Sequence, residues 1–258
     1  NHDLIDSLIH DGLWCAFDQE HMGTGTQRYA DEKKISRSAQ DELAARSHEL
    51  AAAAMKEGRF VDEIAPVEIP QRKGDPLIVD SDEGVRPETT LDSLGALRPA
   101  FGKEGTITAG NASQISDGAA ALIMTSAEKA ADLGLTPIAE FVSYGMVAGP
   151  DASLLHQPSR AIKRALDPID KTASDIDLFE INEAFAAVGV ASIKDLGVSG
   201  DIVNVNGGAI ALGHPVGMSG ARIVLTLINE LRRRGGGLGA AALCGGGGQG
   251  DAAIVRTL

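Results

Sequence analysis

In this sequence of 258 residues, His214 stands at the end of a glycine-rich segment, and this setting suggests a chemical role. A largely β-branched stretch, Ile202 to Val205, predicts a buried strand, and the chain then reaches Gly207-Gly208 shortly before His214. Pro215 suits the first turn of a helix, and the pattern over 216–234 is helical, so we expect His214 at a helix N-terminus. The helix dipole there disfavours imidazolium and favours a neutral base. A turn histidine that merely caps backbone is the alternative.

Cys244 is the second candidate, because it stands between an apolar run and four glycines. The run at 238–243 predicts a strand, and Gly245 to Gly248 would leave backbone N–H groups exposed after it. Such N–H groups suit the binding of an oxyanion. Two alternatives are a buried structural cysteine and a phosphate-binding loop over 245–250. The phosphate loop is disfavoured because no Gly-Lys-Ser or Gly-Lys-Thr follows the glycines.

Three motifs in a fixed order give these two residues a common context. Asn182-Glu183-Ala184-Phe185 comes first, Gly213-His214-Pro215 second and Cys244-Gly245-Gly246 third. This order of Asn-Glu-Ala-Phe, Gly-His-Pro and Cys-x-Gly resembles the C-terminal half of the thiolase family. The likeness extends over the whole chain and includes His21-Met22-Gly23 and Gly110-Asn111-Ala112-Ser113. Within the family, the sequence is most similar to the acetyl-CoA acetyltransferase type.

The resemblance implies an activity and a role for each motif. Thiolases catalyse the reversible Claisen condensation of acetyl-CoA, and the CoA-dependent thiolysis of β-ketoacyl-CoA, through a ping-pong mechanism with a covalent acyl-enzyme. By resemblance, Cys244 moves a proton between the acyl α-carbon or the incoming thiol and solvent. His214 would activate the nucleophilic cysteine and polarise the thioester oxygen. Asn182 would hold a water at that oxyanion site, the Gly246 N–H would serve the other oxyanion site, and Glu183 would organise its neighbours. These roles suit the reaction, since an enolate needs preset hydrogen-bond donors and an acyl carrier needs a thiolate.

The substrate-binding residues are also assigned by resemblance. His21 and Ser113 match positions that line the channel for coenzyme A and its pantetheine arm, and Phe185 is expected to pack near that arm. Arg72 and Lys73 look like solvated surface from the sequence alone. The family's covering loop grips the CoA phosphates, however, so the resemblance places Arg72 and Lys73 beside those phosphates.

The residue that carries the acyl group has no match in these 258 residues. Thiolases use a cysteine of the N-terminal domain, whereas this sequence contains only Cys15 and Cys244. Cys15 lies in a helical pattern, without the small-residue turn that presents a thiolate at a helix N-terminus. We therefore expect the nucleophile in a segment that precedes residue 1. A second departure is Leu155-His156-Gln157-Pro158, where many thiolases have Gly-x-Gly-Pro before the helix at the substrate pocket. A histidine at this position could face the substrate, but we favour a surface loop histidine for His156.

Two other functions are weighed against this one. A catalytically silent subunit that only binds CoA or acyl-CoA would have no physical need for His214, Asn182 and Cys244 together. A decarboxylating ketoacyl synthase shares the fold, but such enzymes use two histidines, or a histidine and an asparagine, where this chain has His214 and Cys244.

The composition of the chain limits the classes of partner and the cellular compartment that we expect. The formal net charge of −13 argues against nucleic acid, and no apolar run approaches the ~20 residues needed to span a bilayer, which argues against a membrane partner. Two cysteines without Cys-x-x-Cys spacing argue against a zinc site or a disulfide framework and favour a reduced, cytoplasmic setting. The resemblance implies acyl-CoA substrates, fatty acid metabolism, no bound metal or permanent cofactor, and a homo-oligomer, either a dimer or a tetramer.

The elements that must position these residues alternate between helix and strand, which predicts an α/β protein. An aromatic content of 3% within an apolar share of 43% favours an aliphatic core. The resemblance implies the layered αβαβα thiolase fold. The expected divisions are a covering loop domain at 1–113, the end of the N-terminal core domain at 114–136 and one complete C-terminal core domain at 137–258.

The element boundaries follow from apolar periodicity and capping residues. Either Ser36 or Ser38 could cap the first long helix, which ends at Gly58, and Ser38-Ala39-Gln40-Asp41 approximates a capping box. The other predicted helices are 126–134, 158–166, 183–196 and 216–234, and the predicted strands are 117–124, 138–143, 176–181, 202–205, 238–243 and 252–257.

Overall fold

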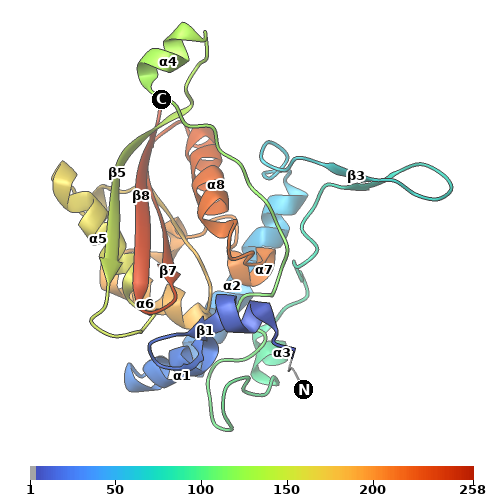
Figure 1. Cartoon of the computed structure of the whole chain (residues 1–258), viewed down its shortest axis with the longest axis vertical. Coiled ribbons are helices and arrows are strands. Elements are labelled where there is room, and N and C mark those ends of the chain that lie inside the picture. The colour runs from blue at the N-terminus through green and yellow to red at the C-terminus, as the bar shows by residue number, and fades with distance from the viewer. Residues whose placement is uncertain (1–3) are drawn as a thin grey trace.

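The C-terminal half of the chain is built around a four-stranded sheet in the order β5-β8-β7-β6 (Figure 1). The computed structural model describes residues 4–258. The strands are β5 (Ala139–Ala148), β6 (Leu178–Ile181), β7 (Leu238–Gly245) and β8 (Gln249–Thr257). β8 is antiparallel to both β5 and β7, whereas β6 and β7 run parallel. The carboxyl ends of β6 and β7 therefore meet at the same edge of the sheet.

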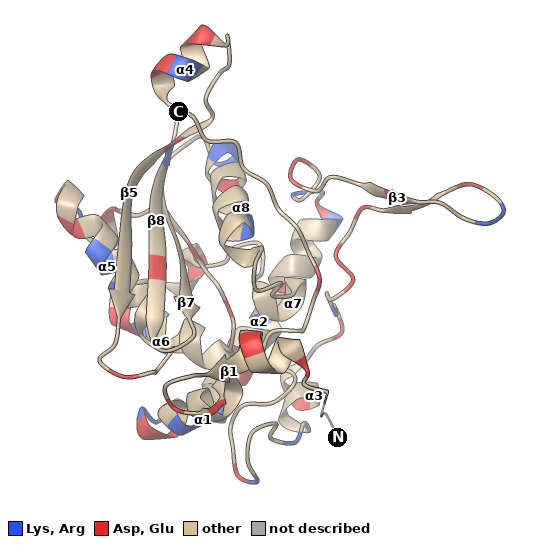
Figure 2. Ribbon diagram, in the orientation of Figure 1, with Lys and Arg blue, Asp and Glu red and all other residues tan. Residues whose placement is uncertain are grey.

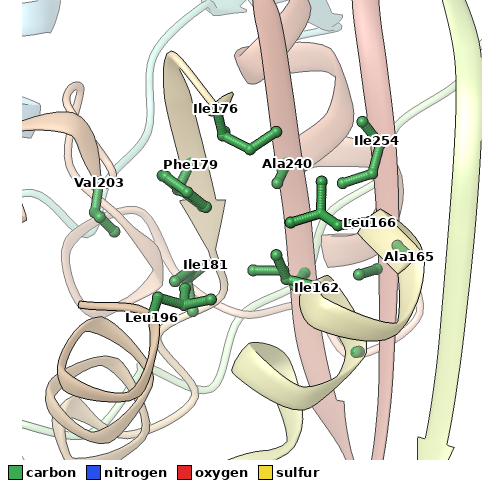
Figure 3. Packing of buried hydrophobic residues seen from close by; sticks show 13 residues of the cluster. Ile162, Ala165, Leu166, Ile176, Phe179, Ile181, Leu196, Val203, Ala240 and Ile254 are labelled. Atoms are coloured by element: carbon green, nitrogen blue, oxygen red, sulfur yellow. The ribbon is translucent and has the colours of Figure 1, made fainter. Parts of the chain in front are cut away.

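Helices cover both faces of this sheet. α5 (Gln157–Leu166) and α6 (Ala186–Leu196) pack on one face, and α8 (Ser219–Arg233) packs on the other. Ile162 and Leu166 of α5 meet the aliphatic side chains of the sheet in a fully buried cluster (Figure 3). The expected α/β class, with a layered C-terminal domain, is confirmed.

β6 divides its side chains between two environments. Phe179 and Ile181 are buried in the cluster formed with α5 and α6. Leu178 packs in a second cluster with α8, and Glu180 lies on that same side, where it contacts Arg222. This alternation is the normal two-residue period of a strand. Apolar burial on both faces therefore fixes the register of β6.

The N-terminal half consists of helices and two small hairpins. α2 (Arg37–Lys56) packs against α6, which fastens this half to the sheet. The hairpin of β3 (Val67–Ile69) and β4 (Leu77–Val79) extends away from the rest of the molecule (Figure 1).

No helix among residues 4–258 is both long enough and apolar enough to cross a bilayer. The remaining elements are the π-helical turn Leu8–Leu13, β1 (Trp14–Cys15), β2 (Glu20–His21), α1 (Met22–Glu32), α3 (Leu91–Gly95), α4 (Ala127–Asp132), α7 (Ala209–Leu212) and the 3-10 turns Asp167–Ile169, Ala173–Asp175 and Gly200–Ile202.

Ser36 is the residue that caps α2. Its side chain accepts a hydrogen bond from the backbone N–H three residues ahead, at 3.2 Å. The capping box proposed on Ser38 is wrong, because Asp41 is engaged elsewhere. Its two carboxylate oxygens bind Arg37, at 2.7 Å, and the side-chain amide of Asn111, at 2.8 Å.

Two predicted strands do not form. Residues 117–124 have no regular secondary structure and are mostly exposed, Ile123 at 94%. No described strand pairs with them, so their backbone groups have no ladder partner and remain in solvent. The stretch 202–205 makes only isolated bridges, because Asn204 has a left-handed backbone with φ 48°. The Asn204 side-chain amide bonds both the N–H and the C=O of Ile181, at 2.8 Å each, in place of a strand ladder.

The helix predicted from residue 183 starts later, because α6 begins at Ala186. Phe185 forms a bridge with Ala112, and the Ala186 N–H donates to the Asn111 carbonyl at 2.8 Å. These contacts keep the segment before α6 extended and hold it against residues far upstream. The helix expected around Cys15 is also wrong, since Cys15 lies in β1.

Candidate active site

Two of the side chains predicted for catalysis lie at the edge where β6 and β7 end. Asn182 directly follows β6, and its N–H donates to the Ala242 carbonyl of β7 at 2.9 Å. Cys244 lies two residues further along β7. The parallel pairing of the two strands thus places Asn182 and Cys244 on neighbouring strand ends.

His214 reaches Asn182 from the loop between α7 and α8. Its Nε2 lies 3.3 Å from Asn182 Nδ2, and its Nδ1 lies 2.6 Å from Ser219 Oγ. The helix predicted to start at residue 216 begins at Ser219, because the Pro215 carbonyl accepts two backbone N–H groups and closes a turn first. His214 is therefore attached to the start of α8 through a side-chain contact.

The hydrogen bonds around His214 assign the proton of its neutral ring. Ser219 Oγ donates its single proton to the Pro215 carbonyl at 3.0 Å, so it accepts from Nδ1–H of His214. Nε2 is then the acceptor for the Asn182 amide. Burial, and after it the charge of Arg222, lowers the pKa of His214 to about 4. The ring is consequently neutral at neutral pH, with an unprotonated Nε2. The sequence predicted a neutral ring for a different reason, the helix dipole.

Cys244 carries a protonated thiol at neutral pH. Burial raises the pKa of Cys244 to about 12. Its side chain packs against a buried cluster from α1, α6 and the segment before α5, together with the partly buried Met22 and Phe185. A thiol in this state suits the donation of a proton, whereas it does not suit a resting nucleophile.

The glycines after Cys244 allow a tight turn and a close approach. Gly247 and Gly248 have φ of 77° and 74°, a left-handed conformation that turns β7 into β8. A Cβ on Gly246 would overlap the tip of the Met22 side chain, and one on Gly247 would overlap the ring of Phe17. This loop is therefore packed directly under the β1–β2 hairpin and the start of α1.

Glu183 organises the loop that follows β6. Its carboxylate accepts hydrogen bonds from Ser47 Oγ at 2.7 Å, Asn204 Nδ2 at 2.9 Å and the Ile210 N–H at 3.1 Å. Burial raises the pKa of Glu183, and these donors act in the opposite direction. The residue ties α2 and α7 together behind Asn182.

Three of the residues assigned to CoA binding lie together. His21 stacks on Phe101, with ring centroids 5.2 Å apart, and Phe101 meets the Phe185 ring edge-on at 6.2 Å. Ser113 donates to the Ala184 carbonyl from both its hydroxyl, at 3.0 Å, and its backbone N–H, at 3.1 Å. Burial lowers the pKa of His21, which favours its neutral form. We call His21, Phe101 and Phe185 the aromatic row.

Arg72 and Lys73 do not join this group within the chain. Both are exposed in the loop between β3 and β4, and in Figure 2 the ribbon at the far end of that hairpin has the blue of Lys and Arg. The β3–β4 hairpin that carries this loop extends away from the rest of the molecule (Figure 1). The shared CoA channel expected for Arg72, Lys73, His21 and Ser113 stays a prediction.

His156 is partly buried and has a defined partner. It precedes α5, and its Nδ1 lies 2.6 Å from the Asp195 carboxylate on α6. The contact joins the two helices on one face of the sheet. His156 is therefore not the free surface histidine that the sequence suggested.

Three residues of the site were not predicted from the sequence. Ser219 could have been suspected, because it stands five residues after His214 at the start of a helix. Phe101 lies in an irregular segment with no periodic signal. Arg222 pairs with Glu180, a residue 42 positions earlier, at 3.1 Å, and no sequence spacing indicates such a contact.

Comparison with known families gives the class of protein that this fold and site define. The family described as "Thiolase, N-terminal domain" matches residues 1–128, and the one described as "Thiolase, C-terminal domain" matches residues 135–257. The chain belongs to the thiolase family, as its three motifs indicated.

Among the members of this family, the chain is similar to proteins named acetyl-CoA acetyltransferase. A protein named "Probable acetyl-CoA acetyltransferase" from Mycolicibacterium smegmatis is 57% identical over 253 residues, which are 98% of this chain and 65% of that protein. "Acetyl-CoA acetyltransferase" from Cupriavidus necator is 52% identical over 254 residues, 98% of this chain and 64% of that protein. The crystal structure of the Bacillus anthracis acetyl-CoA acetyltransferase superposes with a TM-score of 0.94 at 41% identity, and covers 100% of this chain and 65% of that one. The chain thus spans 64% to 65% of the length of these relatives.

Proposed function

We propose that this chain supplies the proton-transfer and oxyanion-binding groups of an acetyl-CoA acetyltransferase. The reaction is the reversible Claisen condensation of acetyl-CoA, or, in the other direction, the thiolysis of a β-ketoacyl-CoA. The observation that carries the proposal is the hydrogen-bonded row Asn182–His214–Ser219, at the sheet edge where the Cys244 thiol also lies. The names of the relatives support it, and they favour neither a silent subunit nor a decarboxylating synthase.

Cys244 would shuttle one proton in each turnover. In thiolysis, the C–C bond of the β-ketoacyl group breaks as its acyl part bonds to the nucleophilic sulfur. The Cys244 thiol then protonates the α-carbon of the departing acetyl-CoA enolate. Its thiolate next takes the proton of the incoming CoA thiol, whose sulfur attacks the acyl-enzyme and releases the nucleophile. A thiol with a pKa of about 12 holds its proton until the enolate forms, which the first step requires.

His214 and Asn182 would stabilise the charge that develops on the thioester oxygen. Nε2 of the neutral ring can accept the proton of the nucleophilic thiol and, as imidazolium, donate a hydrogen bond to that oxygen. Asn182 Oδ1 is fully buried and has no hydrogen-bond partner among residues 4–258, which suits an acceptor for a bound water. The Gly246 N–H would stabilise the second oxyanion.

The aromatic row and Ser113 would bind the pantetheine arm of CoA. His21 and Phe185 offer flat apolar faces, and Ser113 lies beside Phe185. A pantetheine arm alternates amide and methylene groups, so such a surface can pack along it. Arg72 and Lys73 remain candidates for phosphate contacts only where another chain brings a CoA molecule to the β3–β4 hairpin.

The remaining proposals rest on the resemblance to thiolases. We propose a cytoplasmic homo-oligomer, a dimer or a tetramer, that acts in fatty acid metabolism, takes CoA and acetyl-CoA as substrates and needs no bound metal or permanent cofactor. Residues 1–113 would form the covering loop domain, 114–136 the end of the N-terminal core domain, and 137–258 the C-terminal core domain. A boundary near 136 is supported by the two family matches, which part between residues 128 and 135.

We also propose that the nucleophilic cysteine lies outside these 258 residues. Cys15 is only 5% exposed, and its Sγ accepts a hydrogen bond from the Asp18 N–H. The test is to incubate residues 1–258 alone with acetyl-CoA and to search for a covalent acetyl group by mass spectrometry. No adduct is expected at a catalytic rate, and acetylation of Cys15 with turnover would refute the proposal.

Substitution of Cys244 tests the proposed activity itself. In the full-length protein, Cys244→Ser should lose thiolysis and condensation by ~10²–10⁴-fold, the usual contribution of one acid–base group. The variant should still accept an acetyl group from acetyl-CoA, because the CoA thiolate that leaves in this step can take its proton from solvent when Cys244 is absent. Cys15→Ser is the matched control and should retain wild-type turnover. Near wild-type turnover of Cys244→Ser would remove Cys244 from the mechanism.

A further inference from the structure

A buried ion pair lies directly behind the Asn182–His214 contact. Arg222 Nη1 is 3.1 Å from Glu180 Oε2, and the two side chains are only 14% and 3% exposed. The second guanidinium nitrogen, Nη2, is buried without a hydrogen-bond partner among the described residues. A buried pair of this kind is weak evidence for stability, because desolvating both charges offsets most of their attraction. Stability alone therefore gives little reason for a charged pair here.

The position of the pair relates it to the site. Glu180 and Asn182 are two residues apart at the end of β6, so they lie on the same side of the strand. Ser219 and Arg222 are three residues apart in the first turn of α8, so they lie on the same side of the helix. Two connections consequently run in parallel between β6 and α8. One is the row Asn182–His214–Ser219. The other is the pair Glu180–Arg222, which lies two residues earlier on β6 and three residues later on α8.

Arg222 also acts electrostatically on four acidic residues, of which Glu180 and Glu183 are buried. Desolvation raises the pKa of Glu180, Glu63, Asp82 and Glu183. The charge of Arg222 acts against each of these shifts, and it lowers the pKa of His214. One guanidinium thus acts on four carboxyl groups and on the imidazole of the site.

We propose that Arg222 is a positioning residue, whose ion pair with Glu180 holds the start of α8 against the end of β6 and so fixes the contact between Asn182 and His214. The proposal rests on the function assigned above to these two residues. Arg222 touches neither substrate nor reacting atoms. It acts through Ser219 and His214, and its charge additionally disfavours imidazolium at the site.

The test uses substitutions of Arg222 and Glu180 in the full-length protein. Arg222→Met removes the charge and the pair while keeping a long apolar stem. Glu180→Leu with Arg222→Met replaces both charges and leaves no unpaired carboxyl, so it covers the case in which the single variant fails to fold. Arg233→Met is the matched control, because Arg233 pairs with Glu230 on the same helix, far from His214, and is 44% exposed.

Two readouts separate a positioning role from a merely structural one. Steady-state thiolysis of acetoacetyl-CoA should show kcat lowered by about 10- to 100-fold in both Arg222 variants, as for other supporting contacts of a site, with KM changed much less. Histidine NMR titration, with His214→Asn used to assign the signal, should show the pKa of His214 moved upward toward 6.5. Arg222→Lys keeps the charge and should recover most of both losses. Arg233→Met should match the wild type in both measurements.

The outcomes distinguish this proposal from the proposed function. If folded Arg222→Met, or the folded double variant, keeps the wild-type kcat and His214 titration, the positioning role is refuted and the function stands. If the wild type shows no thiolysis but the His214 titration still moves in the Arg222 variants, the proposed function fails and the link between Arg222 and His214 is supported.

Discussion

His214 should make the free energy of unfolding of this protein depend on pH, and the substitution His214→Gln should remove that dependence. An unfolded histidine has a pKa of about 6.5, whereas burial lowers the pKa of His214 to about 4 in the folded chain. Between these values the unfolded state binds more protons than the folded state, so the free energy of unfolding falls as pH falls. The contribution of the neutral His214 ring to the free energy of unfolding is fully present above about pH 6.5 and is lost progressively toward pH 4.

The magnitude follows from the size of the shift. The pKa of His214 differs by about 2.5 between the unfolded and folded states, which corresponds to about 3 kcal/mol of unfolding free energy lost between pH 7 and pH 4. Other groups also titrate in this range. Glu180, whose pKa is raised by burial, contributes in the opposite direction, since its contribution to the free energy of unfolding is lost as pH rises. The contributions of those other groups cancel in the difference in unfolding free energy between the wild type and His214→Gln, because both proteins carry the same groups.

The assay is urea denaturation of the wild type and His214→Gln at several pH values from about 4 to 7. The difference in unfolding free energy, wild type minus variant, should fall by about 3 kcal/mol from pH 7 to pH 4. His10→Gln, at an exposed histidine, should follow the wild-type curve. A difference that stays constant within about 1 kcal/mol, or that rises as pH falls, would refute the assignment of a buried neutral ring.

Three further predictions concern kinetics and binding. Ser219→Ala removes the acceptor of His214 Nδ1–H and should lower kcat for thiolysis by about 10- to 100-fold, and a kcat within twofold of wild type would contradict the assigned tautomer. Gly246→Ala should lower kcat for thiolysis, because its Cβ overlaps the tip of Met22 and would displace the N–H proposed for the second oxyanion, and Met22→Ala in the same chain should restore kcat if packing is the cause. Phe101→Ala removes the ring between His21 and Phe185 and should weaken CoA binding by calorimetry, with an affinity equal to wild type counting against the aromatic row.

The sequence was most informative where one local pattern decides the structure. The helical period and a serine at its start predicted α2, and Ser36 does cap it. Aliphatic runs predicted β7 and β8, since a strand between two helical layers must be apolar. The candidate residues His214, Asn182 and Cys244 came from motif order, because their separation along the chain carries no geometric information by itself.

The sequence was least informative where a contact joins distant segments. Asn204 looked like one residue of a strand, but its side chain takes over the hydrogen bonds of Ile181 that a ladder would have used. Residues 117–124 have the composition of a strand, yet strand formation needs a neighbour and none of the described strands pairs with them. The Glu180–Arg222 pair required two charged residues to become buried together, which local propensity does not anticipate.

The alternation along β6 makes catalysis a sensitive reporter of correct folding. A shift of β6 by one residue relative to β7 would turn Phe179 and Ile181 toward α8 and bury Glu180 and Asn182 among aliphatic side chains. Such a misfolded form could retain its helices and much of its compactness, but it would have no amide to offer His214. Partly misfolded molecules should therefore contribute nothing to turnover, and the specific activity of a refolded sample should measure the fraction of chains with β6 in its native register.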